Sequence, residues 1–158
     1  MFKRRKSIVG LDIGSSEVKA IELTDFGDTV KITGFGCGRV DAPEHRAEVI
    51  NEVLQTAGIK TRRVATAVSG RSVIVRYIAL PPMTEEEVRH ALPYEADKYI
   101  PFDTDEVSID GQILEEFEED VGGERKCRVL MVAVKKDLLQ EHSSLIMETG
   151  LIPVSIDI

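Results

Sequence analysis

The most constraining feature of this chain is a polar turn between two apolar stretches within residues 8–24. Apolar residues precede Gly14, and apolar residues alternate with polar ones after Glu17, a pattern typical of two half-buried strands. The polar residues between the stretches therefore fall at the connection of a hairpin. At or beside this turn lie Asp12, Gly14, Ser15, Ser16 and Lys19.

These residue types suit the binding of a nucleotide's phosphates. Gly14 can adopt a positive φ and has no Cβ, so the amides of Gly14, Ser15 and Ser16 would point into one anion-binding concavity. Lys19 would add a positive charge for a phosphate. Asp12 would hold a magnesium ion through water, because that ion keeps most of its hydration shell. An ordinary hairpin with a solvated lysine fits the same short pattern, so spacing alone leaves both interpretations open.

Composition limits the class of protein. The 158 residues are enough to bury a core, and 42% hydrophobic with 30% charged residues is typical of a globular protein. The net charge of −8 argues against general nucleic-acid binding. Cys37 and Cys127 lack the spacing of a zinc site or a disulfide framework, so we expect a reduced, cytoplasmic protein. No apolar run is long enough for a spanning helix or a signal peptide.

The first residues carry a positive charge, whereas the chain as a whole is negatively charged. Residues 3–6 read Lys-Arg-Arg-Lys, and residues 1–6 are interpreted as a basic tail. Such a tail can contact an anionic membrane surface, although a simply solvated terminus is the favoured interpretation.

The first half of the chain predicts three meandering strands, a helix and a returning strand. A strand at 30–40 carries glycines at 34, 36 and 38, which share one face, so we expect a helix to pack closely there. That helix is predicted over 43–57, followed by a strand at 63–69.

A second group of elements follows. Thr84 and Glu87 form a capping-box pattern at the start of a helix, and Pro93 predicts a kink there or a division into two short helices. The acidic segment 115–124 is interpreted as a solvated hairpin tip, and His142 as a hydrogen-bonded core histidine rather than a ligand. The other predicted elements are strands at 72–80, 107–114, 127–134 and 151–158, and a helix at 136–149.

Three stretches together resemble the PilM family of actin-like proteins of type IV pilus assembly, and the likeness covers essentially the whole chain. The stretches are residues 9–19, 95–102 and 150–154. Asp12-x-Gly14 with Lys19 looks like the first phosphate motif of the whole superfamily of actin, sugar kinases and heat-shock chaperones. The sequence Tyr99-Ile100-Pro101-Phe102, followed by an acidic residue and a strand, narrows the resemblance to the pilus proteins.

The resemblance implies a mixed α/β fold with an actin-like, ribonuclease H-like half-core. Subdomain 1A would comprise residues 7–70 and 151–158, and an inserted subdomain 1C, as in the cell-division protein FtsA, would comprise 71–150. Subdomains 2A and 2B would be absent. In the family pattern Asp12 matches the magnesium-water aspartate and Lys19 the phosphate lysine. The phosphate turn matches Gly14, Ser15 and Ser16.

The resemblance also implies cofactors and partners. The full-length parent would bind ATP with magnesium and be at most a weak ATPase, whereas this chain alone would bind ATP weakly or not at all. The N-terminal cytoplasmic tail of the inner-membrane protein PilN would lie in a groove between 1A and 1C. Other pilus alignment and motor components would be partners at the inner face of the bacterial inner membrane. Surfaces left open by the missing subdomains would favour a dimer.

Two alternatives share the superfamily. A sugar or acetate kinase needs a general base beside the phosphates, and no second acid has a recognisable context in this sequence. The cytoplasmic domain of an L-class type II secretion protein shares the fold, but it normally keeps a membrane span and a degenerate phosphate turn, whereas this turn looks intact.

Overall fold

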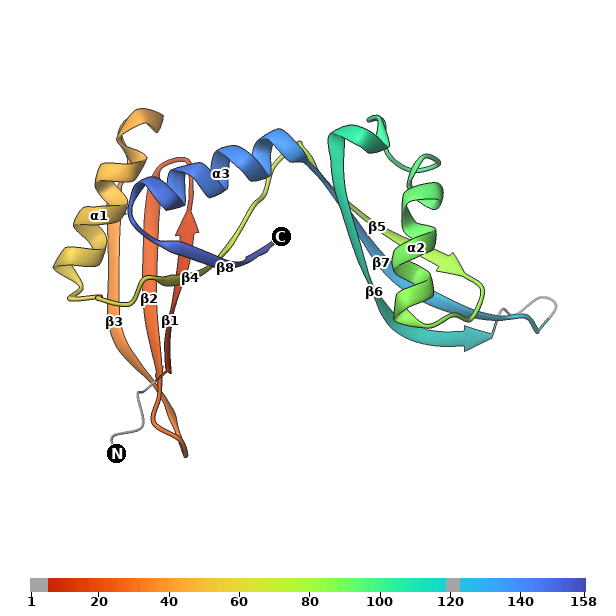
Figure 1. Ribbon diagram of the computed structural model, residues 1–158, viewed down its shortest axis with the longest axis horizontal. Coiled ribbons are helices and arrows are strands. Elements are labelled where there is room, and N and C mark those ends of the chain that lie inside the picture. The colour runs from red at the N-terminus through yellow and green to blue at the C-terminus, as the bar shows by residue number, and fades with distance from the viewer. Residues whose placement is uncertain (1–5, 119–122) are drawn as a thin grey trace. The chain divides into compact units, whose positions relative to one another are not determined.

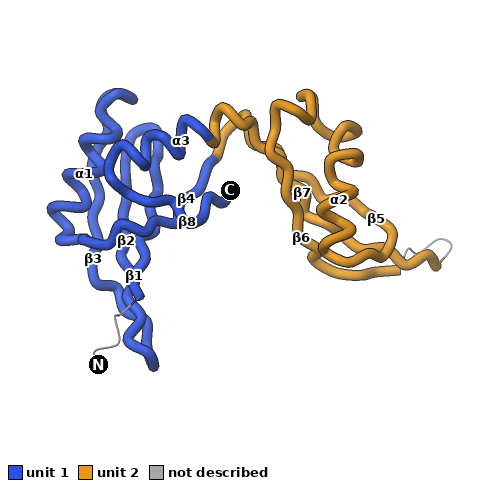
Figure 2. Tube along the Cα trace, in the orientation of Figure 1, with its two compact units in different colours: residues 1–68, 140–158 blue, residues 69–139 orange. Residues whose placement is uncertain are grey.

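The computed structural model describes residues 6–118 and 123–158, which form a mixed α/β chain. It divides into two compact units, unit 1 with residues 1–68 and 140–158, and unit 2 with residues 69–139 (Figure 2). Of the expected basic tail, residues 3–5 lie outside the described residues, and Lys6 already belongs to the first strand rather than to a tail. Within the described ranges, no helix combines the length and apolar character that crossing a membrane requires.

Unit 1 contains a five-stranded sheet of order β3-β2-β1-β4-β8 (Figure 1). Its first three strands form an antiparallel meander, whereas β4 runs parallel to β1, and β8 runs parallel to β4. The strands are β1 (Lys6–Ile13), β2 (Glu17–Asp25), β3 (Val30–Arg39), β4 (Arg63–Ala67) and β8 (Ile152–Asp157).

One helix covers the glycine face of β3, as the sequence predicts. A short 3-10 turn, η1 (Pro43–His45), leads into α1 (Arg46–Thr56), which runs alongside β3 (Figure 1). A Cβ at Gly38 would lie 2.7 Å from Cγ2 of Val53, and one at Gly36 would lie 3.1 Å from the carbonyl oxygen of Val53. Only residues without a side chain permit this close approach of strand and helix. The apolar face of α1 is buried, with Val49, Ile50, Val53 and Leu54.

Most of helix α3 (Lys136–Glu148) belongs to unit 1, whereas the sequence predicted that it would belong to the inserted subdomain. The boundary was expected at residue 150, but from Gln140 onward α3 belongs to unit 1. Ile146 is fully buried in the same core as the strands of the five-stranded sheet. His142 bonds through Nε2 to the Thr66 hydroxyl at 3.0 Å, so the expectation of a hydrogen-bonded histidine is confirmed. Burial lowers the pKa of His142 below its usual 6.5.

Unit 2 is a three-stranded antiparallel sheet of order β5-β7-β6 with one helix packed on it (Figure 1). Its elements are β5 (Val73–Leu80), α2 (Glu85–Ala96), the 3-10 turn η2 (Thr104–Glu106), β6 (Val107–Glu118) and β7 (Arg125–Lys135). Leu92 of α2 and Met131 of β7 are almost completely buried at the centre of this second core.

Pro93 does not divide the expected helix into two short ones. α2 is a single helix over twelve residues with Pro93 inside it. The ring of Pro93 lies on the exposed side, while Val88, Leu92 and Ala96 repeat at four-residue intervals on the buried side. Burial of that stripe on the sheet stabilises both halves of the helix and offsets the missing backbone hydrogen bond.

The expected solvated hairpin tip is shorter than predicted. Strand β6 continues to Glu118, so residues 115–118 belong to the sheet, whereas residues 119–122 lie outside the described residues. Glu115 pairs with Arg128 at 2.6 Å, and Glu116 pairs with Arg125, both across the strands of the hairpin. These opposite charges on facing strands stabilise the pairing of β6 with β7. The acidic composition of residues 115–118, taken alone, had indicated a solvated turn instead.

The capping box at the start of α2 is confirmed and gives a first prediction. The Thr84 hydroxyl accepts from the Glu87 amide, and the Glu87 carboxylate accepts from the Thr84 amide at 2.7 Å. Two hydrogen bonds lower the pKa of Glu87 below its ordinary 4.5. The larger effect comes from the Thr84 amide and the smaller one from the Thr84 hydroxyl. The contribution of the Glu87 carboxylate to the stability of the fold is therefore fully present above pH 4.5, and it is lost as the pH falls through the lower pKa of the folded state.

Thr84→Ala should cost about 1 kcal/mol of stability in urea unfolding at pH 7, because it removes one side of the capping box. Titration of the Glu87 carboxyl by NMR should show the lowered pKa in the parent chain and a return toward 4.5 in the variant. The return should be partial, because alanine keeps the backbone amide that is the larger cause of the shift, and an unchanged pKa would contradict a contribution from the Thr84 hydroxyl.

Candidate functional site

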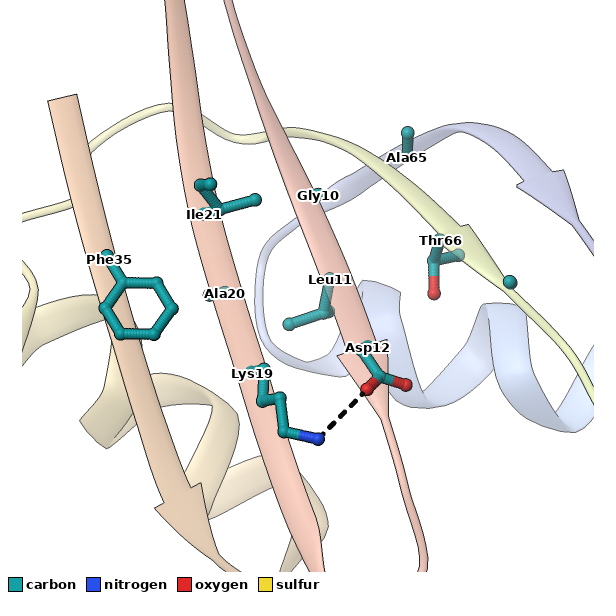
Figure 3. A pocket seen from close by; sticks show the side chains of 10 residues that line it. Gly10, Leu11, Asp12, Lys19, Ala20, Ile21, Phe35, Ala65 and Thr66 are labelled. Carbon is teal, nitrogen blue, oxygen red and sulfur yellow. Dashed lines mark ion pairs between the residues drawn. The ribbon is translucent and has the colours of Figure 1, made fainter. Parts of the chain in front are cut away.

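The β1–β2 hairpin brings two of the candidate residues together. The antiparallel register places Asp12 on β1 directly opposite Lys19 on β2. The Lys19 ammonium lies 3.5 Å from Oδ2 of Asp12 and 3.6 Å from Oε2 of Glu17 (Figure 3 shows the pair with Asp12). The side chain of Asp12 is 68% exposed, that of Lys19 is 52% exposed and that of Glu17 is 58% exposed, so each is accessible to a ligand from solvent.

Gly14 has a role in the turn that differs from the predicted one. It does not adopt a positive φ. A Cβ there would lie 2.9 Å from the carbonyl oxygen of Glu17, so glycine is required by the close approach of two backbone segments. The Gly14 amide donates to that same carbonyl at 2.9 Å and is used inside the turn. The expected nest of three free amides is therefore incorrect for Gly14.

The backbone amides of Ser15 and Ser16 remain available as hydrogen-bond donors to an anion. In the part of the chain that the structure describes, neither amide makes a hydrogen bond, and both residues are exposed. The carbonyl of Ser16 accepts from the Val40 amide at 2.8 Å, which ties the turn to the end of β3. The hairpin thus offers two backbone donors and one ammonium to an anion.

Electrostatically, the site holds one cation between two anions. The Lys19 ammonium is shared by the carboxylates of Asp12 and Glu17. Arg39 faces Glu17 in the strand register, but its guanidinium pairs with Asp41 at 3.8 Å. A phosphate that approaches the turn must therefore compete with carboxylates for Lys19.

Asp12 was expected to hold a magnesium ion through water. Within residues 6–118 and 123–158, no three or more His, Cys, Asp or Glu side chains gather as a metal-binding group. Magnesium keeps several of its water ligands and is commonly bound by one or two carboxylates together with the phosphates of a nucleotide, so a single carboxylate would need such phosphates beside it. The ion would have to displace the Lys19 ammonium from Asp12, which is easier when a phosphate binds Lys19 at the same time.

An open hollow of about 520 Å³ adjoins the ion pair on one face of the sheet. Asp12 and Lys19 form its polar end, and Gly10, Ile21 and Phe35 line its apolar part (Figure 3). Our interpretation of the sequence missed this hollow. The signal was present in the alternation of β2 and β3, because Ile21 and Phe35 face each other away from the glycines that α1 covers.

The strand order and the hairpin together define the class of fold. An antiparallel meander continued by two parallel strands, with a polar turn between the first two strands, is the arrangement of the actin-like, ribonuclease H-like half-core that was expected. A family model for the type IV pilus assembly protein PilM matches residues 10–158. The chain belongs to this family.

Solved structures support the same assignment. The chain is similar to the PilM-PilN type IV pilus biogenesis complex, with a TM-score of 0.80 and 28% identity over 96% of this chain and 47% of that one. It is also similar to the cytoplasmic domain of EpsL, an inner-membrane component of the type II secretion system of Vibrio cholerae. That match has a TM-score of 0.60 and 16% identity over 96% of this chain and 56% of the other, and it shows the fold alone. The chain spans about half the length of these two structures.

Proposed function

We propose that this chain acts in type IV pilus assembly as a scaffold that binds the N-terminal cytoplasmic tail of a PilN protein. The observation that carries the proposal is the likeness to a PilM-PilN complex over 96% of the chain. The binding partner would place the chain at the inner face of the bacterial inner membrane, next to the other alignment and motor components of the pilus.

Both units have features suited to an extended peptide. The outermost strands, β3 and β8 in unit 1 and β5 and β6 in unit 2, pair on one side only among the described residues. A free strand edge binds an extended segment through main-chain hydrogen bonds, and neighbouring apolar side chains add specificity. Exposed side chains such as Phe35 on β3 and Tyr77 on β5 lie on two of these edge strands.

Fluorescence anisotropy with a labelled PilN N-terminal peptide tests this proposal. We expect saturable binding to the 158-residue chain and none with a scrambled peptide of the same composition. If the peptide binds neither this chain nor a full-length relative, the scaffold proposal is wrong.

We further propose that the hairpin contributes one half of a site for ATP and magnesium. The proposal is supported by Lys19 and the amides of Ser15 and Ser16, which offer donors to phosphates, and by Asp12 for the ion. A single hairpin provides few contacts to a nucleotide, so ATP should bind this chain weakly or not at all. Titration calorimetry with magnesium and ATP measures this directly, and micromolar affinity would contradict the expectation.

Self-association is a separate proposal. Val30, Ile32 and Phe35 on the edge strand β3 are 65%, 63% and 66% exposed, which is a large apolar exposure for one strand. We propose that the isolated chain dimerises at high concentration through such surfaces. Light scattering over a concentration series tests this, and a constant monomer mass would rule it out.

A further inference from the structure

We infer that Glu17 sets the affinity of the hairpin for phosphate groups by competing with them for Lys19. This inference depends on the proposed phosphate binding, and it identifies Glu17 as a residue that weakens that binding. The chemical class of ligand is a polyphosphate anion, and the residue acts on the ligand through the ammonium of Lys19.

The geometry places Glu17 in direct competition with a bound anion. Glu17 and Lys19 are two residues apart on β2, so both side chains project from the same face of the sheet. The Glu17 carboxylate lies 3.6 Å from the Lys19 ammonium. Ser15 and Ser16 immediately precede Glu17 in the chain, so a phosphate that accepts from their amides lies at the end of β2 where Glu17 is located.

The backbone of Glu17 keeps this side chain in place. Its carbonyl accepts from the Gly14 amide at 2.9 Å, and its strand position is fixed by pairing with Arg39 of β3. The backbone from which the carboxylate projects is therefore fixed at the turn. Arg39, the nearest candidate to neutralise it, pairs with Asp41 instead. In the described part of the chain, the ion-pair partner of Glu17 is Lys19.

Asp12 also pairs with Lys19, but the two carboxylates differ in their effect. Asp12 is proposed to hold magnesium, whose positive charge would offset the charge of the carboxylate when nucleotide binds. Glu17 has no such proposed partner and would remain as a negative charge beside the phosphates. Its removal is thus expected to strengthen phosphate binding, whereas removal of Asp12 would also remove the ion.

The expected size of the effect is moderate. Exposed ion pairs are weak, so Glu17 holds Lys19 with little free energy, and its removal returns only a modest part of the attraction of Lys19 for a phosphate. We expect Glu17→Gln to tighten the binding of tripolyphosphate by about threefold to tenfold at low ionic strength. In 1 M salt, where the Debye length is about 3 Å, the gain should largely disappear.

A titration with sodium tripolyphosphate, followed by amide NMR shifts of Ser15 and Ser16, measures the effect even at millimolar affinity. Glu52→Gln is the matched control, because it changes the net charge equally on an exposed position of α1, which covers the opposite face of the sheet. It should leave the dissociation constant within about twofold, because α1 and the sheet lie between Glu52 and the face that carries Lys19, and the described ion pairs of Lys19 involve Asp12 and Glu17 instead. The double variant Glu17→Gln with Lys19→Ala should lose the gain.

The outcomes separate this inference from the proposed function. If the parent chain binds tripolyphosphate and loses it on Lys19→Ala, but Glu17→Gln binds no more tightly, the competition is wrong and the phosphate site stands. A gain that persists in the double variant, or appears equally in Glu52→Gln, also overturns the competition. If no variant shows binding that depends on Lys19, the proposed phosphate site is wrong, and the role of Glu17 is rejected with it.

Discussion

Leu92→Ala is expected to lower the free energy of unfolding of unit 2 by about 2–5 kcal/mol, the range for truncating a buried leucine. The Leu92 side chain is 1% exposed and belongs to the core between α2 and the sheet. Its Cδ1 lies only 2.6 Å from the position that a Cβ of Gly111 would occupy. Because Gly111 has no side chain, the residue of β6 that faces this end of Leu92 cannot move into the cavity left by truncation.

Tyrosine fluorescence is a selective probe for this prediction. The chain has no tryptophan, and its three tyrosines, Tyr77, Tyr94 and Tyr99, all belong to unit 2. Urea unfolding followed at the tyrosine signal should shift to a lower midpoint in Leu92→Ala. Leu114→Ala is the matched control, since Leu114 is 46% exposed on β6, and it should cost less than about 0.5 kcal/mol. Equal losses in the two variants would contradict the packing of α2.

Gly38→Val is expected to destabilise unit 1 by about 1–3 kcal/mol through overpacking. The first added carbon would lie 2.7 Å from Cγ2 of Val53 and 2.9 Å from Cγ1 of Val49. Both neighbours are valines with a restricted χ1, so they cannot rotate out of the way without strain. The helix α1 would have to move away from β3.

Hydrogen exchange read by mass spectrometry places the effect in the chain. Peptides from residues 30–56 should exchange faster in Gly38→Val, whereas peptides from unit 2 should be unchanged. Cys37→Val provides the control, because Cys37 is the preceding residue of the same strand, is exposed and faces away from α1. If both variants accelerate exchange equally, the close contact between β3 and α1 is not the cause.

Much of the fold could be predicted because it depends on local patterns. The alternation around the polar turn predicted β1 and β2 and placed Asp12 and Lys19 near one another. The three glycines of β3 predicted a closely packed helix, since a strand face without side chains lets a neighbouring backbone approach. The capping box gave the start of α2 to the residue, because its two hydrogen bonds involve side chains only three positions apart.

The remaining features depend on contacts between distant parts of the chain. The role of Gly14 was wrongly predicted because close approach of Glu17 and a positive φ both favour glycine. Burial of one stripe of α2 offset the effect of Pro93, which the local sequence could not reveal. The acidic residues of β6 appeared solvated in the sequence because their basic partners, Arg125 and Arg128, lie on the next strand.

Unit 1 is discontinuous in sequence, and this has a consequence for synthesis on the ribosome. Its core contains Val64 from before unit 2 and Ile146 and Leu151 from after it. All of residues 69–139 must therefore leave the ribosome before β8 can pair with β4 and close the first core. We expect the inserted unit, whose contacts are contained within one continuous segment, to reach its native state first during translation, and the enclosing unit to mature last.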